Sequence, residues 1–218
     1  MNLLLWSFAT LLAGYFAIQI FREWIEKRKM AQLAWLIGFF LYTFSAFGSA
    51  WAYLSGWDET IYRLWYVSAA SLVAFLGAGQ LYFTVKPKVA HLFLLLIIAI
   101  TAVMMFKALT VPVDLTVLQE AQGEIGGAAL PSEVRVFSPI LTIPGSIALI
   151  GGALFTALAR KSKSGLWIGI GSLIIAMGGT FTRLDLPEAL PIANSIGIGL
   201  IYYGYALTQR RSVQKANA

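Results

Sequence analysis

The chain has 218 residues, of which 59% are hydrophobic and only 12% are charged, and its mean hydropathy is +0.76. This composition excludes an ordinary water-soluble domain. The absence of cysteine excludes disulfides, iron–sulfur clusters, thiolate nucleophiles and Cys-ligated zinc, and the single histidine excludes a haem held by two histidines of this chain.

Seven apolar segments follow one another along the chain, each close to the length of about 20 residues that a helix needs to cross a bilayer. They run over 2–21, 31–54, 63–85, 89–109, 138–159, 165–183 and 190–208. We therefore predict an all-α integral membrane protein whose seven transmembrane helices form a single domain over 1–218. No basic region precedes the first apolar run and no clear small-residue cleavage site follows it, so we interpret it as a retained helix.

The charges between these segments predict the orientation. Twelve of the 16 basic residues fall on one side, accompanied by two acids, and the other side carries eight of the 10 acids. The positive-inside rule then places the N-terminus outside and the C-terminus in the cytoplasm of a prokaryotic plasma membrane. Because the basic residues form short clusters between apolar runs, the net charge of +6 does not indicate nucleic acid as a partner.

Tryptophans near the predicted segment ends support the same placement of the segments across the membrane, since amphipathic rings favour the headgroup region. We interpret them as interface anchors, with a Trp-lined binding site as the alternative. The residues concerned are Trp24, Trp35, Trp51, Trp57, Trp65 and Trp167.

An internal repeat is indicated by a motif that occurs twice, 120 residues apart. Gly77, Gly79 and Tyr82 in the third segment correspond to Gly197, Gly199 and Tyr202 in the seventh. Weaker matches link Gly38 to Gly169 and Gly14 to Gly152, which pairs the second segment with the sixth and the first with the fifth. We expect each glycine of the two motifs to let a neighbouring helix approach closely.

The predicted layout is a parallel repeat of three helices, one connector and three helices. Repeat one covers 2–85, the connector helix 89–109, an external loop 110–137, repeat two 138–208 and a cytoplasmic tail 209–218.

This layout is similar to that of SWEET-type sugar transporters and of opsins. The residues that carry function in those families have no counterpart here: neither Gln19 nor Gln80 follows a proline, and 190–208 contains no lysine for a retinal Schiff base. More closely, the chain resembles a group of uncharacterised small seven-helix bacterial membrane proteins, which implies the fold and no activity. That resemblance rests on 62–66, 76–82, Lys86-Pro87, Ile143-Pro144-Gly145 and 151–154.

The interior chemistry is predicted to be neutral. No Asp, Glu or His lies deep in a segment, where a charge would cost several kcal/mol, which disfavours a proton pump or a carboxylate-dependent carrier. Neutral polar groups concentrate on the third and seventh segments, and they either bond helix to helix or orient a ligand with a largely apolar body. The candidate ligand-binding residues are Gln80, Tyr82, Asn194, Tyr202 and Tyr205.

Two further features concern the fifth segment and the loop before it. Pro144 removes a backbone hydrogen bond and Gly145 permits close packing, which predicts a static kink or a hinge. In the loop, Asp114 is placed to cap a short helix from Leu115 to Gln122. The loop is apolar enough to lie across the mouth of the bundle as a lid, or on lipid headgroups instead.

The sequence predicts a function in outline only. We expect a polytopic membrane protein that binds or translocates a small neutral or lipophilic solute, with the lipid bilayer and that ligand as its partners. Two alternatives stay open: a ligand sensor that acts through a separate partner protein, and an accessory or structural subunit of a larger membrane complex. No nucleophile–base pair or metal constellation is present, so we predict no enzyme, cofactor or metal, and the cluster of Arg183, Asp185 and Glu188 is read as a surface ion pair.

Overall fold

The computed structural model describes residues 1–121, 123–182 and 188–216, with backbone only at 180–182 and 208–216. The part of the chain that it describes is all-helical, without strands. The long helices are α1 (Asn2–Lys27), α2 (Met30–Ser55), α3 (Glu59–Leu81), α4 (Pro87–Thr110), α9 (Lys163–Thr182) and α10 (Ala189–Ala216). The shorter elements are α5 (Leu115–Glu120), α6 (Ser132–Arg135), α7 (Phe137–Ser146), the π-helical η1 (Ile147–Gly151) and α8 (Gly152–Ala159).

Two of the helices begin at an aspartate that caps them. The Asp58 carboxylate accepts hydrogen bonds from the backbone N–H groups of Thr60 and Ile61, which satisfies two free donors at the start of α3. Asp114 caps α5 in the same way, as its sequence predicts. The predicted end of that helix at Gln122 lies outside the described residues. Pro87 occupies the first turn of α4, where its missing N–H costs nothing.

Six helical segments are long and apolar enough to cross a membrane. They are α1, α2, α3, α4, the continuous segment Ser132–Ala159 and the described part of α10 up to Leu207. The predicted sixth segment forms α9, whose apolar part Lys163–Gly179 is shorter than the other six. By length and composition, six described segments could cross a membrane, and the seventh predicted span is not confirmed.

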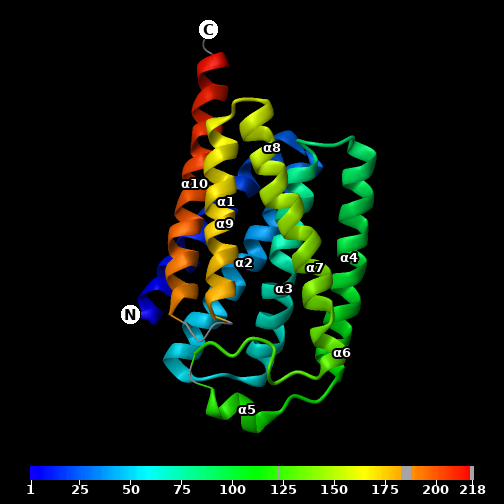
Figure 1. Ribbon diagram of the computed structural model, residues 1–218, viewed down its shortest axis with the longest axis vertical. Coiled ribbons are helices and arrows are strands. Elements are labelled where there is room, and N and C mark those ends of the chain that lie inside the picture. The colour runs from blue at the N-terminus through cyan, green and yellow to red at the C-terminus, as the bar shows by residue number, and fades with distance from the viewer. Residues whose placement is uncertain (122, 183–187, 217–218) are drawn as a thin grey trace.

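The spans form a ring with α4 outside it (Figure 1). Helix α1 packs on α2, α2 on α3, and α3 on the segment formed by α7, η1 and α8. That segment packs on α9, α9 packs on α10, and α10 returns to α1, which closes the ring. Helix α4 packs on α3 and α7 from the outer side.

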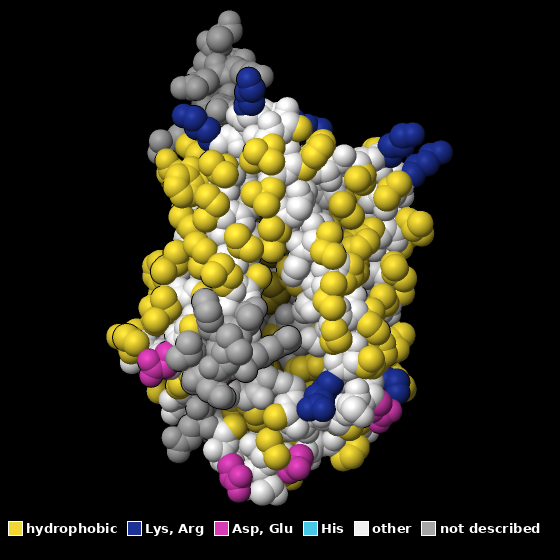
Figure 2. Space-filling model, in the orientation of Figure 1, with side chains coloured by type: hydrophobic (Ala, Val, Ile, Leu, Met, Phe, Trp, Pro, Cys, Tyr) yellow, Lys and Arg dark blue, Asp and Glu magenta, His cyan; other side chains and the backbone are white. Residues whose placement is uncertain are grey.

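The outward faces of the helices are apolar, as a lipid environment requires. On α1, Leu4, Phe8 and Leu11 are exposed at helical spacing, whereas Ala9 and Ala13 on the opposite face are buried. Figure 2 shows hydrophobic side chains over the middle of the molecule, with lysines and arginines at the upper end and most visible acids at the lower end. We call these the basic end and the acidic end.

The loop between α4 and α7 folds across the acidic end of the ring. The indole Nε1 of Trp57 donates to the carbonyl of Gly123 at 2.7 Å, and the Tyr62 hydroxyl donates to the carbonyl of Gly126 at 3.1 Å. Leu118 and Leu130 of the loop are buried in the same core as α3 and α4. The loop therefore lies across the bundle mouth, one of the two placements that its apolar residues predict.

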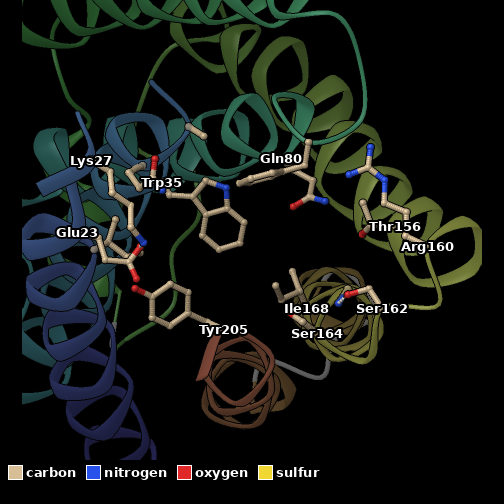
Figure 3. Close-up of a pocket in the computed structure, with 15 residues that line it drawn as sticks. Glu23, Lys27, Trp35, Gln80, Thr156, Arg160, Ser162, Ser164, Ile168 and Tyr205 are labelled. Carbon is tan, nitrogen blue, oxygen red and sulfur yellow. Dashed lines mark hydrogen bonds and ion pairs between the residues drawn. The ribbon is translucent and has the colours of Figure 1, made fainter. Parts of the chain in front are cut away.

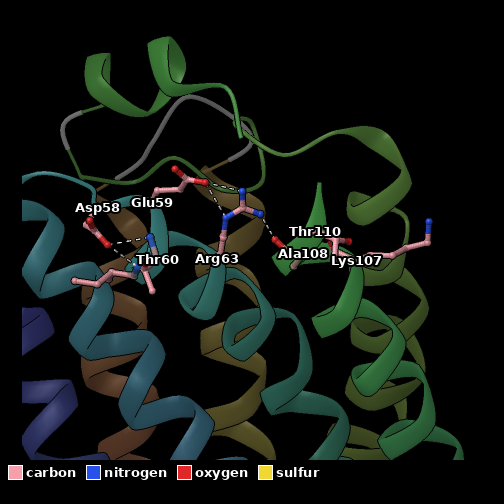
Figure 4. A network of polar contacts seen from close by, with 8 residues as sticks. Asp58, Glu59, Thr60, Arg63, Lys107, Ala108 and Thr110 are labelled. Atoms are coloured by element: carbon pink, nitrogen blue, oxygen red, sulfur yellow. Dashed lines mark hydrogen bonds and ion pairs between the residues drawn. The ribbon is translucent and has the colours of Figure 1, made fainter. Parts of the chain in front are cut away.

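A polar network joins α3 to the end of α4 beside this loop (Figure 4). Arg63 pairs with Glu59 at 2.6 Å and donates from Nη1 to the carbonyl of Ala108 in the last turn of α4. Carbonyls in that turn have no partner within their own helix, so the guanidinium satisfies one of them. Lys107 reaches instead to Glu133 of α6, at 3.1 Å.

The fifth span changes its helical geometry directly after Pro144 and Gly145. Proline lacks the N–H that would donate one turn back, and the chain passes into the π-helical turn η1 three residues later. At Gly145 a Cβ would lie 2.6 Å from the Cα of Ala74, so the absence of a side chain lets this span approach α3 closely. Whether the site acts as a hinge stays a prediction.

Candidate functional site: a pocket at the basic end

A pocket of about 320 Å³ lies inside the ring at the basic end (Figure 3). Its walls come from α1, α2, α3, α8, α9 and α10, which are the helices of the ring, and α4 makes no part of it. The lining residues are Ile20, Glu23, Lys27, Ala31, Gln32, Trp35, Gln80, Phe83, Thr156, Arg160, Ser162, Ser164, Gly165, Ile168 and Tyr205. Its volume is at the lower end of the range for small-molecule sites, about 300–1,000 Å³.

Gln80, at the end of α3, is the polar side chain that most clearly faces this space. Only 4% of its surface is exposed, and its amide forms no hydrogen bond with any described residue. Figure 3 shows the amide pointing into the cavity. Its amide atoms are not among the fully buried polar atoms that lack a partner, so they reach the cavity, and their donors and acceptor are available to a ligand or to water.

Two glycines make room for the groups around Gln80. At Gly79 a Cβ would collide with Cδ1 of Trp35, so the absence of a side chain there lets the indole pack directly on α3. At Gly152 of α8 a Cβ would lie 2.8 Å from Cγ of Gln80. The indole Nε1 of Trp35 is buried and has no partner among the described residues. The packing around Gln80 thus depends on two positions without a side chain, Gly79 on α3 and Gly152 on α8.

Charged groups stand on opposite walls of the pocket. Figure 3 shows Glu23, Lys27 and Tyr205 on one side and Arg160, Thr156 and Ser162 on the other. Lys27 Nζ lies 3.9 Å from Oε2 of Glu23, the outer limit of an ion pair, and Oε1 of Glu23 is buried without a hydrogen-bond partner. Arg160 is exposed and forms no ion pair with the described residues.

The structure brings together two of the five residues predicted to bind a ligand. Gln80 and Tyr205 both line the pocket. Tyr82 lies close by in sequence but outside the lining, with its ring against His91 at 5.1 Å and its buried hydroxyl without a described partner.

Asn194 and Tyr202 of α10 lie elsewhere. The Asn194 amide accepts from the Tyr42 hydroxyl at 2.5 Å and donates to the Leu190 carbonyl at 2.9 Å. Eleven residues separate it from Tyr205, about 16 Å along the helix. Tyr202 packs its ring on Phe16 at 5.6 Å. Ligand binding by these residues stays a prediction, and the contacts seen here join α10 to α1 and α2.

The predicted packing glycines also meet different surroundings. Gly77 lies against the backbone of Gly145, where a Cβ would be 2.5 Å from the carbonyl oxygen, and Gly197 lies equally close to the carbonyl oxygen of Gly171. A Cβ at Gly199, by contrast, would meet no atom within 4 Å. Three of the four glycines therefore sit at close helix contacts, and Gly199 faces open space.

Sequence reasoning missed the charged and aromatic parts of the pocket. Trp35 was interpreted as an interface anchor, and Glu23, Lys27 and Arg160 as charges of cytoplasmic loops. One signal was available: Glu23 and Lys27 are four residues apart and share a helix face with Ile20. That pattern is equally common on solvated helix ends, so it does not by itself indicate a pocket.

Comparison of the chain with protein-family models, with curated proteins and with solved structures gave no match. Within the described residues, no group of three or more His, Asp or Glu side chains is placed to hold a metal ion. The pocket is therefore the feature of this chain that points to a function.

Proposed function

We propose that this chain is a seven-span protein of a prokaryotic plasma membrane, with its N-terminus outside, that binds or translocates a small solute through the pocket at its basic end. The observation that carries the proposal is Gln80, a deeply buried amide without a described partner that points into a 320 Å³ pocket. A glutamine that only joined helices would be expected to form a hydrogen bond with a neighbouring helix, and the Gln80 amide forms none with the described residues.

The position of the pocket supports access from the basic side. Lys27, Phe83 and Arg160 line it and are exposed, so they form its rim. At the other end of the ring, the loop after α4 covers the helix ends, and the Tyr42–Asn194 hydrogen bond joins α2 to α10 between that loop and the pocket. Translocation would require this bond and the loop to open.

The arrangement of the helices is also the one that a parallel repeat would give. A two-fold axis that relates the first three spans to the last three would make two contacts equivalent. One is the contact between α3 and the fifth span, and the other is the contact between α10 and α1. Both contacts close the same ring. The pocket lies inside that ring, between the two proposed repeats, as the binding sites of such transporters do, but at the basic end of the ring.

The lack of cysteine allows a direct test. In a Ser164→Cys variant the thiol lines the pocket, and a total extract of small cellular metabolites should slow its alkylation by a small maleimide. A Lys88→Cys variant carries its thiol at the same end but outside the pocket, and the extract should leave its alkylation rate unchanged. Equal rates with and without extract at Ser164→Cys would contradict solute binding in this pocket.

A further inference from the structure

The pocket carries charged side chains on two walls, Glu23 with its loosely paired Lys27 on one and Arg160 on the other. Glu23 of α1 faces the cavity from one side and Arg160, after α8, faces it from the other (Figure 3). Between them lie largely apolar surfaces, the ring of Trp35 and the side chain of Ile168. A ligand that satisfies both walls needs two charged ends separated by an apolar spacer.

The carboxylate of Glu23 lacks a good donor. One oxygen, Oε1, is buried with no described partner, and the other has only the ammonium of Lys27 at 3.9 Å. Because the side chain of Lys27 is exposed, a ligand ammonium can replace it at Glu23 at small cost. Unpaired carboxylates are costly when partly removed from water, so this wall favours a cationic donor.

The opposite wall favours an anion. Arg160 has no ion-pair partner among the described residues, and the Gln80 amide, which lines the same pocket, offers two further N–H donors. A guanidinium and an amide together provide the hydrogen-bond donors that a carboxylate accepts. Hydrogen bonds to charged groups are about twice as strong as those between neutral groups.

From these contacts we propose that the pocket binds a zwitterion whose ammonium and carboxylate stand at opposite ends of an apolar chain. This rests on the proposed function and specifies its ligand class: the ammonium lies at Glu23, the carboxylate at Arg160 and Gln80, and the spacer on Trp35. Such a ligand pairs with Glu23 and Arg160 at once, and the Lys27 ammonium that it replaces is exposed and stays solvated. The distance between the ammonium and the carboxylate distinguishes this ligand from an α-amino acid, in which both groups are attached to one carbon.

The test uses the Ser164→Cys protein and four probes. The first is ε-aminocaproate. The second is its isomer leucine, in which the ammonium and the carboxylate are both attached to one carbon. Caproate lacks the ammonium, and hexylamine lacks the carboxylate. ε-Aminocaproate should protect the thiol at concentrations about tenfold lower than each of the other three, which corresponds to about 1.4 kcal/mol.

Charge-neutral variants in the same background assign the two ends. Glu23→Gln should abolish the preference for ε-aminocaproate over caproate, and Arg160→Gln should abolish its preference over hexylamine. The matched controls Glu26→Gln and Lys88→Gln lie outside the pocket and should keep both preferences. Because each result is a ratio measured within one variant, changes in stability or thiol reactivity cancel.

Several results would overturn the proposal that the pocket binds such a zwitterion. Equal protection by caproate would make the pocket an anion site, equal protection by hexylamine a cation site, and equal protection by leucine a site for an α-amino acid. Protection by the metabolite extract with none from ε-aminocaproate would reject the zwitterion while leaving solute binding intact. If neither the extract nor ε-aminocaproate protects the thiol, both solute binding and the zwitterion proposal are rejected.

Discussion

Glu124 is a carboxyl that the loop after α4 holds against the end of α1. Its Oε1 accepts a hydrogen bond from the indole Nε1 of Trp6 at 2.8 Å, and the ring of Tyr53 lies beside Gly123 next to it. Burial raises the pKa of Glu124 to about 7, against a smaller opposing effect of the bond from Trp6. The loop that covers the acidic end therefore contains a group that titrates near neutral pH.

This raised pKa predicts that the loop packs less firmly as the pH rises. The folded protein holds the proton more tightly than the unfolded chain, so the stability linked to Glu124 is fully present below about pH 4.5 and is lost as the pH rises through 7. After allowance for partial exposure we expect about 1 kcal/mol, a fall in Tm of about 2–4 °C between pH 5 and pH 8. Thermal unfolding in detergent measures it.

A Glu124→Gln variant provides the control for this titration. It keeps an acceptor for Trp6 and removes the ionisable group, so its Tm should change less than that of the native protein between pH 5 and pH 8. An identical pH dependence in both proteins would show that another group is responsible.

At the scale of elements, the helices themselves could be predicted from the sequence. Runs of apolar residues predict all the long helices, six of which are long and apolar enough to span a membrane, and Asp114 marks a helix start that the structure also has. This signal is local, because a cap acts on the turn next to it. Of these helices, α10 continues to Ala216, beyond the apolar stretch that predicted it.

The pocket could be predicted only in part, for a physical reason. In a membrane, the inner and outer faces of a helix are both apolar, so periodicity does not show which face lines an interior space. Gln80 and Tyr205 were found because they are polar in an apolar run, whereas Trp35 was not, since tryptophan is also usual at the interface. Which helices surround the cavity follows from their order in the ring, which no local pattern encodes.

The two glycine motifs allow a matched test of helix packing. Gly79→Ala would place a methyl group on the Trp35 ring, displace the indole from α3 and destabilise the protein by about 1–3 kcal/mol. Gly199→Ala, at the equivalent place in the other motif, meets open space and should be neutral or slightly stabilising. Thermal unfolding of both variants gives the comparison. Equal destabilisation by both would show that Gly199 also packs against another helix in the membrane.

Across the whole bundle, the order of the helices agrees with an internal repeat, whereas the contacts of the motif glycines do not. The ring has the neighbours that a two-fold relation would give, with α3 on the fifth span and α10 on α1. Gly77, however, contacts the fifth span through Gly145, whereas Gly197 contacts α9 through Gly171. The repeat stays a prediction, and if it is real the two halves have diverged in which helices their glycines contact.

The side from which a solute reaches the pocket depends on the orientation of the ring in the membrane. Twelve of the 16 basic residues lie at the end that holds the pocket, so we expect that end in the cytoplasm. In intact cells, an impermeant thiol reagent should label Ser55→Cys, exposed at the acidic end, and should label Lys88→Cys only after permeabilisation. Because the native chain has no cysteine, it supplies the unlabelled control, and equal labelling of both variants in detergent verifies that each thiol is reactive. The opposite pattern would place the pocket outside the cell, and the solute would then enter from there.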